Sequence, residues 1–292
     1  MDKSDLWPIT LDAMMALGMQ YVPMMDRAAK KAGVEREIWG LLLTALGFDP
    51  ETISNAKLQV RTPYQEHTKR LADAAEQGLL APVGEDEYRL TEAGNEIAQQ
   101  VILAAYVHLE SLMPLRSPAL HYLLVLLRQV VRASHVSPVP PDKWCITHSR
   151  RFDPGENASR LIQVDQYLSD LAAYRDDAHL SAWQPLGFDG PTWETLTLIW
   201  RGEVDTLDAL HEKLSHRQHP RETYETALES LTERTLVRVD SGVYRITPEG
   251  ETLRQEAEDL TDQYFYAPWE CLIEEDLEAF RNLLILLTEG LP

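Results

Sequence analysis

Residues 227–250, ALESLTERTLVRVDSGVYRITPEG, carry the signals that decide the fold. They predict the end of a helix, a tight two-stranded hairpin and the start of another helix, because apolar alternation flanks an Asp-Ser-Gly turn. Residues 71–94, LADAAEQGLLAPVGEDEYRLTEAG, carry the same signals. The two stretches align without a gap, pairing Leu80 with Leu236, Val83 with Val239, Tyr88 with Tyr244, Arg89 with Arg245, Leu90 with Ile246, Thr91 with Thr247 and Gly94 with Gly250. We therefore predict an internal duplication.

In each copy, helical segments precede the hairpin and a long helix follows it, which is the order of a winged-helix unit. The predicted fold is mainly α with small β-wings, in which a helical segment joins two winged-helix units. The predicted parts are an N-terminal helical segment (1–35), winged-helix unit 1 (36–112), a helical linker domain with a Pro-rich loop (113–190), winged-helix unit 2 (191–262) and a C-terminal helix (263–292).

Within the first unit, the sequence predicts that residues 49–52 start a second short helix, with Asp49 as its cap and Pro50 in the first helical position. A recognition-type helix is expected at residues 63–77 and ends at Gly78. In the second unit, the recognition-type helix is expected at residues 221–234.

The composition limits the class of protein. The 292 residues carry a net charge of −20 and only two cysteines, too few for a disulfide framework or a zinc site, so we expect a reduced, cytoplasmic location. No apolar run approaches the roughly 20 residues that span a bilayer, and the N-terminus does not resemble a signal peptide. The acidic charge opposes phosphate binding unless basic residues gather on one face.

The order of helices followed by a hairpin with GLL and YRLT and then a long helix resembles the MarR-like winged-helix regulators. This resemblance covers about half the chain and implies a winged-helix fold. The C-terminal part also resembles the SalK-like group of bacterial helix-turn-helix proteins, through YRDDAHLSAW at 174–183, ITPEG at 246–250, TD at 261–262 and APW at 267–269. That group has no established activity, so the resemblance implies no reaction, and the chain before residue 150 does not share it.

A winged helix contacts DNA through polar side chains on its third helix. Arginine, glutamine and threonine can contact base edges, and lysine and arginine can anchor phosphates. The candidates in the first unit are Lys57, Arg61, Tyr64, Gln65, His67, Thr68, Lys69 and Arg70, and those in the second are Arg217, Arg221, Thr223, Tyr224 and Arg234.

Carboxylates oppose this assignment. The tip of the first hairpin, residues 85–87, is entirely acidic, and the second tip carries Asp240. The second recognition-type helix also holds Glu222, Glu225 and Glu229. DNA contact and protein contact are therefore both retained as functions of these units.

The stretch between residues 113 and 175 is the basic part of the chain, with Arg116, Arg128, Arg132, Lys143, Arg150, Arg151, Arg160 and Arg175. It could bind an acidic ligand or a nucleic-acid backbone. The interpretation we favour is that it neutralises the acidic C-terminal helices, residues 249–278, within the chain or across a dimer.

Aromatic residues gather in the C-terminal half. They could line a small-molecule pocket between the two units, with Tyr174, His179, Trp183, Trp200 and Trp269 as candidates, although filling the core is the favoured interpretation. The histidines lack H-x-x-x-H spacing, and neither a nucleophile motif nor a phosphate-binding motif occurs. We expect no metal site, no cofactor and no enzymatic activity.

The first functional hypothesis is a DNA-binding transcriptional regulator whose tandem winged helices act as a pseudo-dimer on double-stranded DNA. The alternatives are an acidic adaptor that uses its winged helices for protein contacts, and a regulator that senses a small-molecule effector in the aromatic pocket. The apolar terminal helices also suggest a homodimer, and no membrane association is expected.

Overall fold

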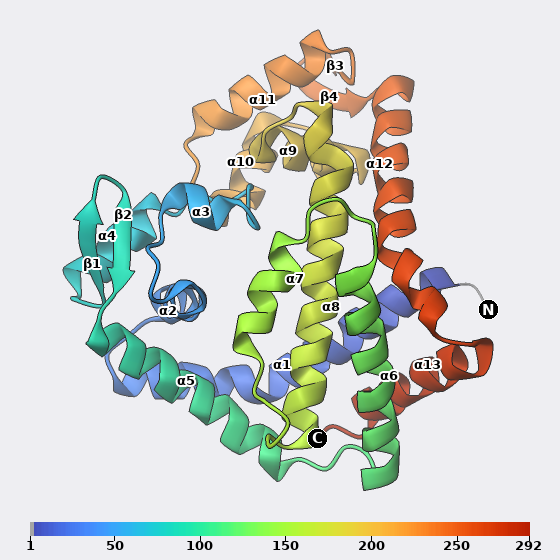
Figure 1. Cartoon of the computed structure of the whole chain (residues 1–292). Coiled ribbons are helices and arrows are strands. Elements are labelled where there is room, and N and C mark those ends of the chain that lie inside the picture. Colours follow the sequence, from blue (N-terminus) through green and yellow to red (C-terminus); the bar gives the residue numbers. More distant parts are fainter. Residues whose placement is uncertain (1–2) are drawn as a thin grey trace. The chain divides into compact units, whose positions relative to one another are not determined.

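The computed structural model describes residues 3–292 and confirms a mainly helical fold with two small antiparallel sheets (Figure 1). The chain forms two compact units. The first contains residues 3–53, 70–177 and 264–292, and the second contains residues 54–69 and 178–263. Two long helices, α8 (Arg160–Trp183) and α12 (Pro248–Tyr266), contribute residues to both units.

The first unit is built on α1 (Leu6–Lys31), which packs against α5 and α13, while α2 packs against α5. Its other helices and strands are α2 (Arg36–Phe48), most of α4 (Thr68–Glu76), β1 (Leu80–Gly84), β2 (Glu87–Leu90), α5 (Glu92–Ser111), α6 (Ser117–Val136), α7 (Trp144–Ser149) and α13 (Glu274–Glu289). Leu17, Leu42, Val101 and Phe280 are completely buried in its core. Burial of one apolar face on each helix is what holds such helices together.

The second unit contains the short helix α3 (Asn55–Gln59) and a helical set formed by α9 (Gly190–Trp200), α10 (Leu207–Lys213) and α11 (Arg221–Glu233). A hairpin of β3 (Val237–Asp240) and β4 (Val243–Ile246) follows α11. Trp193, Leu196, Leu228 and Leu231 are buried in its core. None of the helices formed by residues 3–292 combines the length and apolar content needed to cross a bilayer.

The two hairpins, called here the first wing (β1 and β2) and the second wing (β3 and β4), differ in register. In the first wing Leu80 pairs with Leu90, and the register shifts between Pro82 and Gly84. In the second wing Val237 pairs with Ile246 and the register is regular. The gapless alignment is therefore wrong for the first strand of each wing, because the first wing contains an extra residue in a bulge.

The backbone conformation before each wing shows which residues of the two wings are equivalent. Gly78 and Thr235 both have positive φ, 72° and 60°, at the end of the helix that precedes each wing. The next residues, Leu79 and Leu236, donate backbone hydrogen bonds to Ala74 and Leu231 respectively, which closes each helix in the same way. Leu79 is thus equivalent to Leu236, one position away from the pairing that the sequence suggested.

Two helices predicted in the first unit begin later than expected. The predicted helix start at 49–52 is wrong, since α3 begins at Asn55 after Ser54, whose side chain accepts a hydrogen bond from the Lys57 backbone. The predicted helix at 63–77 begins only at Thr68. The preceding residues form an irregular connection, because the His67 backbone donates to the Asn55 side chain instead of to a helical carbonyl.

Candidate functional site

The second unit presents a helix–turn–helix with well-defined helix starts. Asp189 caps α9 by accepting a 2.8 Å hydrogen bond from the Thr192 backbone, and Thr206 caps α10 by accepting one of 3.3 Å from Ala209. Both are residue types that satisfy the free amides at a helix N-terminus. These caps fix α9 and α10, and α11 packs against both.

The helix α11 has one buried face and one acidic face. Tyr224, Ala227, Leu228 and Leu231 are buried at helical spacing. The solvent-exposed positions include Glu222, Glu225, Glu229 and Glu233, here called the acidic stripe. Four carboxylates on the exposed face oppose insertion of this helix into a DNA groove, because phosphates would repel them.

Two of the predicted DNA contacts on α11 are used within the second unit. Arg221 forms ion pairs with Asp208 at 2.6 Å and Glu225 at 3.4 Å. Tyr224, which we expected to face DNA, is completely buried, and burial raises the pKa of its hydroxyl to about 12. Thr223 is half-buried beside them.

The turn between α10 and α11 is covered by the α3–α4 connection, residues 60–67. The Gln65 side chain donates a 2.8 Å hydrogen bond to the Arg217 carbonyl, and the Glu66 backbone donates another of 3.0 Å. The Arg217 side chain forms a bidentate pair with Glu194, with a shortest distance of 2.6 Å, and its guanidinium lies 5.7 Å from the centroid of the Tyr64 ring.

These contacts correct the sequence prediction for the turn. Gln65 is buried, and Tyr64 and Arg217 are engaged with neighbouring residues of the same unit. Their side chains therefore position the turn. Reading polar residues as DNA contacts missed this role, because the carbonyls and carboxylates that hold them are distant in sequence.

The remaining candidates belong to α3, the connection and α4. Lys57 and Arg61 are half-buried, whereas Thr68 and Lys69 are exposed at the start of α4. Both the backbone and the hydroxyl of Thr68 donate to the Glu66 carboxylate, at 2.9 and 2.5 Å. Arg70 is half-buried and its buried Nε has no hydrogen-bond partner within residues 3–292.

The outer face of the second wing carries an arginine pair that the sequence analysis did not select. Arg238 and Arg245 are directly opposite each other in the register and both are exposed. Within the described chain neither has an ion-pair partner. Side chains alternate along a strand, so their neighbours Val239 and Tyr244 point to the other face, where they line a pocket of about 290 Å³ with residues of α11. The signal was available, since the two arginines alternate with apolar residues on facing strands.

The aromatic pocket candidates are divided between the units. In the first unit, Tyr174 donates a 2.7 Å hydrogen bond to the Val139 carbonyl, and burial raises the pKa of its hydroxyl to about 12. Trp269, in the same unit, is completely buried and packs against Phe280 with their ring centroids 5.1 Å apart.

In the second unit, Trp183 stacks on Trp193 at 5.4 Å, and the His179 ring lies 6.4 Å from Trp183. The buried Arg254 guanidinium lies 5.0 Å from the Trp193 centroid and 4.8 Å from that of Trp200. Burial and aromatic stacking favour the interpretation that these residues fill the core.

Three arginines of the basic stretch pair with carboxylates of the first unit, and neutralisation of the acidic C-terminal helices stays a prediction. Arg150 pairs with the buried Asp170 at 2.7 Å, Arg151 lies 3.5 Å from Glu51, and Arg128 lies 4.0 Å from Glu156. These carboxylates all lie before residue 249. Asp170 was not recognisable as a partner from the sequence because it is 20 positions from Arg150 and is brought near only by folding.

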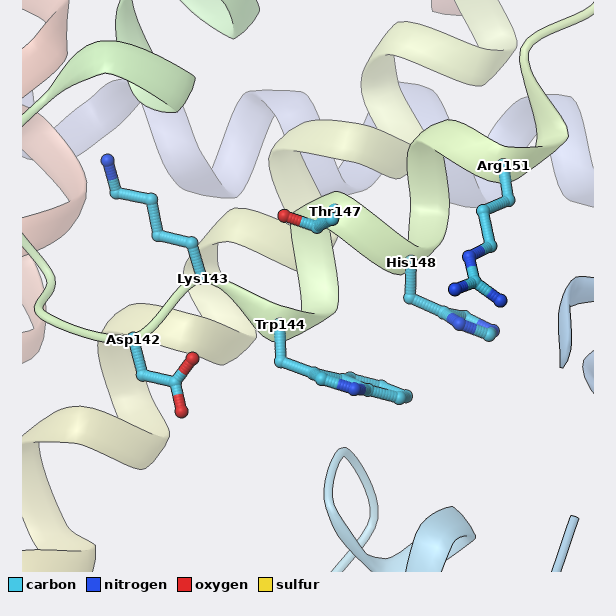
Figure 2. Close-up of a pocket in the computed structure, with 6 residues that line it drawn as sticks. All are labelled: Asp142, Lys143, Trp144, Thr147, His148 and Arg151. Atoms are coloured by element: carbon cyan, nitrogen blue, oxygen red, sulfur yellow. The ribbon is translucent and has the colours of Figure 1, made fainter. Parts of the chain in front are cut away.

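A pocket of about 350 Å³ lies along α7 in the first unit (Figure 2). Figure 2 shows Trp144 and His148 on one side of α7, and their rings stack at 4.7 Å and 7°. Arg151 lies beside His148 and donates a 2.7 Å hydrogen bond to the Gly47 carbonyl, whereas Lys143 points to the other side of the helix and donates to the His135 and Ser137 carbonyls. Both cations thus serve local packing.

Metal ligands do not converge in the described chain. Residues 3–292 contain no group of three or more His, Cys, Asp or Glu side chains arranged to hold a metal ion. Cys145 is buried and Cys271 is exposed, and within the described chain neither forms a disulfide bond.

The C-terminal part of the chain matches a known protein family. A helix-turn-helix family matches residues 159–291, slightly less than half of the chain. The match includes α9, α10, α11 and the second wing, and it overlaps the part that resembles the SalK-like group. Searches of curated proteins and of solved structures found no match.

Proposed function

We propose that this protein is a winged-helix transcriptional regulator that contacts DNA, and that the second wing makes the contact. The single observation that carries the proposal is the exposed arginine pair, Arg238 and Arg245, on the outer face of a wing. Like charges opposite each other on paired strands destabilise a hairpin, whereas a phosphate bound between them would relieve the repulsion. The helix-turn-helix family match gives the same coarse function.

The acidic stripe determines how DNA could be approached. Because carboxylates cover the exposed face of α11, the proposal assigns it no base contacts. If the wing contacts only the phosphate backbone of DNA, binding is expected to be weak and salt-sensitive, with little sequence preference. We further propose that the first wing, whose second strand carries Arg89, arose from the same unit by duplication, so that one chain would act as a pseudo-dimer. No enzymatic activity is assigned.

Fluorescence anisotropy with a labelled DNA duplex tests the proposal between roughly 50 and 200 mM salt. Replacing Arg238 and Arg245 together with glutamine is expected to weaken binding and to lower the slope of log K against log salt by about 2. The matched control is Arg201→Gln, which removes an exposed arginine that already lies 3.9 Å from Glu203. Absence of binding at the lowest salt, or an unchanged slope in the double variant, would overturn the proposal.

A second function, a protein adaptor, is favoured by the acidic stripe itself. Glu229 and Glu233 border the 290 Å³ pocket formed with Val239 and Tyr244, and Val239 is 47% exposed. An apolar floor with an acidic rim fits a basic, amphipathic segment of a partner protein.

The double variant Glu229→Lys and Glu233→Lys separates the two functions. The adaptor function predicts loss of binding to a lysine-rich amphipathic peptide. The DNA-binding function predicts stronger DNA binding, since the change removes repulsion beside the wing. Peptide binding that is insensitive to the double variant would exclude the adaptor function for this surface.

A further inference from the structure

A pocket of about 520 Å³ lies in the second unit, next to the helix–turn–helix. Pro63, Trp183 and Phe188 contribute apolar walls. The pocket is also lined by the residues at the start of α9 and by His219, which precedes α11 by two positions. It thus adjoins both the α3–α4 connection and the turn that this connection covers.

The polar groups around this pocket offer acceptors. Asp189 uses one carboxylate oxygen, Oδ1, to cap α9, which leaves Oδ2 as an acceptor. The Gln59 side-chain amide donates to the Gln65 carbonyl at 3.0 Å, which leaves Oε1. His219 Nε2 lies 3.1 Å from the Tyr64 carbonyl, and since a carbonyl can only accept, Nε2 donates and Nδ1 of the neutral ring is an acceptor.

Asp189 supplies a carboxylate to this pocket. The Arg234 guanidinium lies 3.7 Å from the centroid of the Phe188 ring and donates a 3.2 Å hydrogen bond to the Leu186 carbonyl. A ligand with several N–H donors and a positive charge is complementary to a carboxylate and two neutral acceptors. The apolar walls can accommodate a short hydrocarbon or aromatic stem. The Asp189 carboxylate would repel an anionic ligand.

We propose that this pocket binds a small organic ammonium ion that carries an apolar or aromatic stem. The ammonium group hydrogen-bonds to Asp189 with support from Gln59 and His219, and the stem lies against Pro63 and Phe188. The site goes beyond the proposed DNA contact and does not depend on it, because its residues are distinct from the arginine pair of the wing.

Isothermal titration calorimetry with three probes that share a phenethyl stem tests the site. Phenethylamine is expected to bind. 2-Phenylethanol is expected to bind at least about tenfold more weakly because it lacks the positive charge, and 3-phenylpropionate is expected not to bind because the Asp189 carboxylate repels it. Equal affinities for the three compounds, or no heat from the amine, would overturn the assignment.

Two variants locate the binding. Asp189→Asn removes the charge but keeps the helix cap, since asparagine caps as well as aspartate, and is expected to weaken amine binding at least about tenfold. Gln184→Arg places a cation on an exposed lining residue and should abolish binding without disturbing the core. Glu212→Gln, an exposed carboxylate on α10, is the control and should bind the amine as the wild type does. Binding unchanged in both pocket variants would contradict the site, and none of these results depends on DNA binding.

Discussion

The two wings share their inner hydrogen bonds and differ on their surfaces. In each, a threonine caps the following helix, with Thr91 accepting from Gly94 at 3.0 Å and Thr247 accepting from Gly250 at 3.1 Å. The same hydroxyls lie 3.0 and 3.1 Å from the Leu79 and Leu236 carbonyls. The contacts that recur in both wings are those that join the wing to the following helix. This indicates that they maintain the fold of each unit and do not contact a ligand.

The differences lie elsewhere. The first wing has a bulge, an acidic tip and glycine at the left-handed position, whereas the second has regular pairing, threonine at that position and two facing arginines. Arg89 of the first wing faces Ala81, while Arg245 of the second faces Arg238. If the wings are copies of one unit, the outer faces have changed while the joint with the helix has not.

The largest effect is expected at the shared glycines. A Cβ on Gly94 would lie 2.2 Å from the Leu79 carbonyl oxygen, and one on Gly250 would lie 2.2 Å from that of Leu236. The clashing atom in each case is a backbone carbonyl oxygen, which cannot move aside as the end of a flexible side chain can. Each glycine-to-alanine change should therefore lower the free energy of unfolding by about 3 kcal/mol or more. Chemical denaturation measures it, with Glu249→Ala as a control expected to change little. A small effect at only one glycine would show that the two wings do not pack against the following helix in the same way.

These glycines show how far the sequence was informative. The YRLT and YRIT motifs, the turns and the caps are local, so both wings and the following helices could be predicted from the sequence. The one-residue bulge could not be predicted, because the apolar residues Pro82 and Val83 are compatible with either of two strand registers. Pairing is settled by where Leu79 closes the preceding helix, which is a backbone contact.

The next effect concerns the shared cap. Replacing Thr91 or Thr247 with valine keeps the shape but removes the hydroxyl, so each change should cost about 1–2 kcal/mol of stability. Serine at either position retains the hydroxyl and is the matched control. Thermal unfolding of all four variants tests whether the two caps are equivalent. Markedly unequal losses of stability in the two valine variants would argue against equivalent contacts between each wing and its following helix.

The candidate site was less predictable than the fold. The sequence identified Arg217, Gln65 and Tyr224 as polar or aromatic residues near a recognition helix, but gave no sign that Glu194 and the α3–α4 connection would engage them. Such partners are separated by up to 152 positions, as in the hydrogen bond from Gln65 to Arg217. The arginine pair lies on the strands of the wing, whereas base contacts by a winged helix are expected on its third helix.

A smaller effect is expected at the position where the wings differ in backbone chemistry. Thr235 has a φ of 60°, which is unfavourable for a β-branched residue, whereas Gly78 adopts 72° at the equivalent point without strain. Thr235→Gly should therefore stabilise the protein by roughly 0.5–1 kcal/mol, and Gly78→Thr should destabilise it by about 1 kcal/mol. Denaturant midpoints give both values. A loss of stability in Thr235→Gly would mean that the threonine side chain makes a contribution greater than its backbone strain.

The smallest effect on stability bears most directly on function. Arg245→Thr removes one of two facing like charges and introduces a good strand former, so the second wing should gain a few tenths of a kcal/mol. Arg89 in the first wing faces alanine, so Arg89→Thr gains only from strand propensity and should stabilise the protein less. If Arg245→Thr stabilises the protein and also weakens DNA binding, the arginine pair costs folding free energy and serves binding. If it weakens neither DNA binding nor its salt dependence, the pair has no part in DNA contact, and the acidic stripe of α11 becomes the surface on which function must be sought.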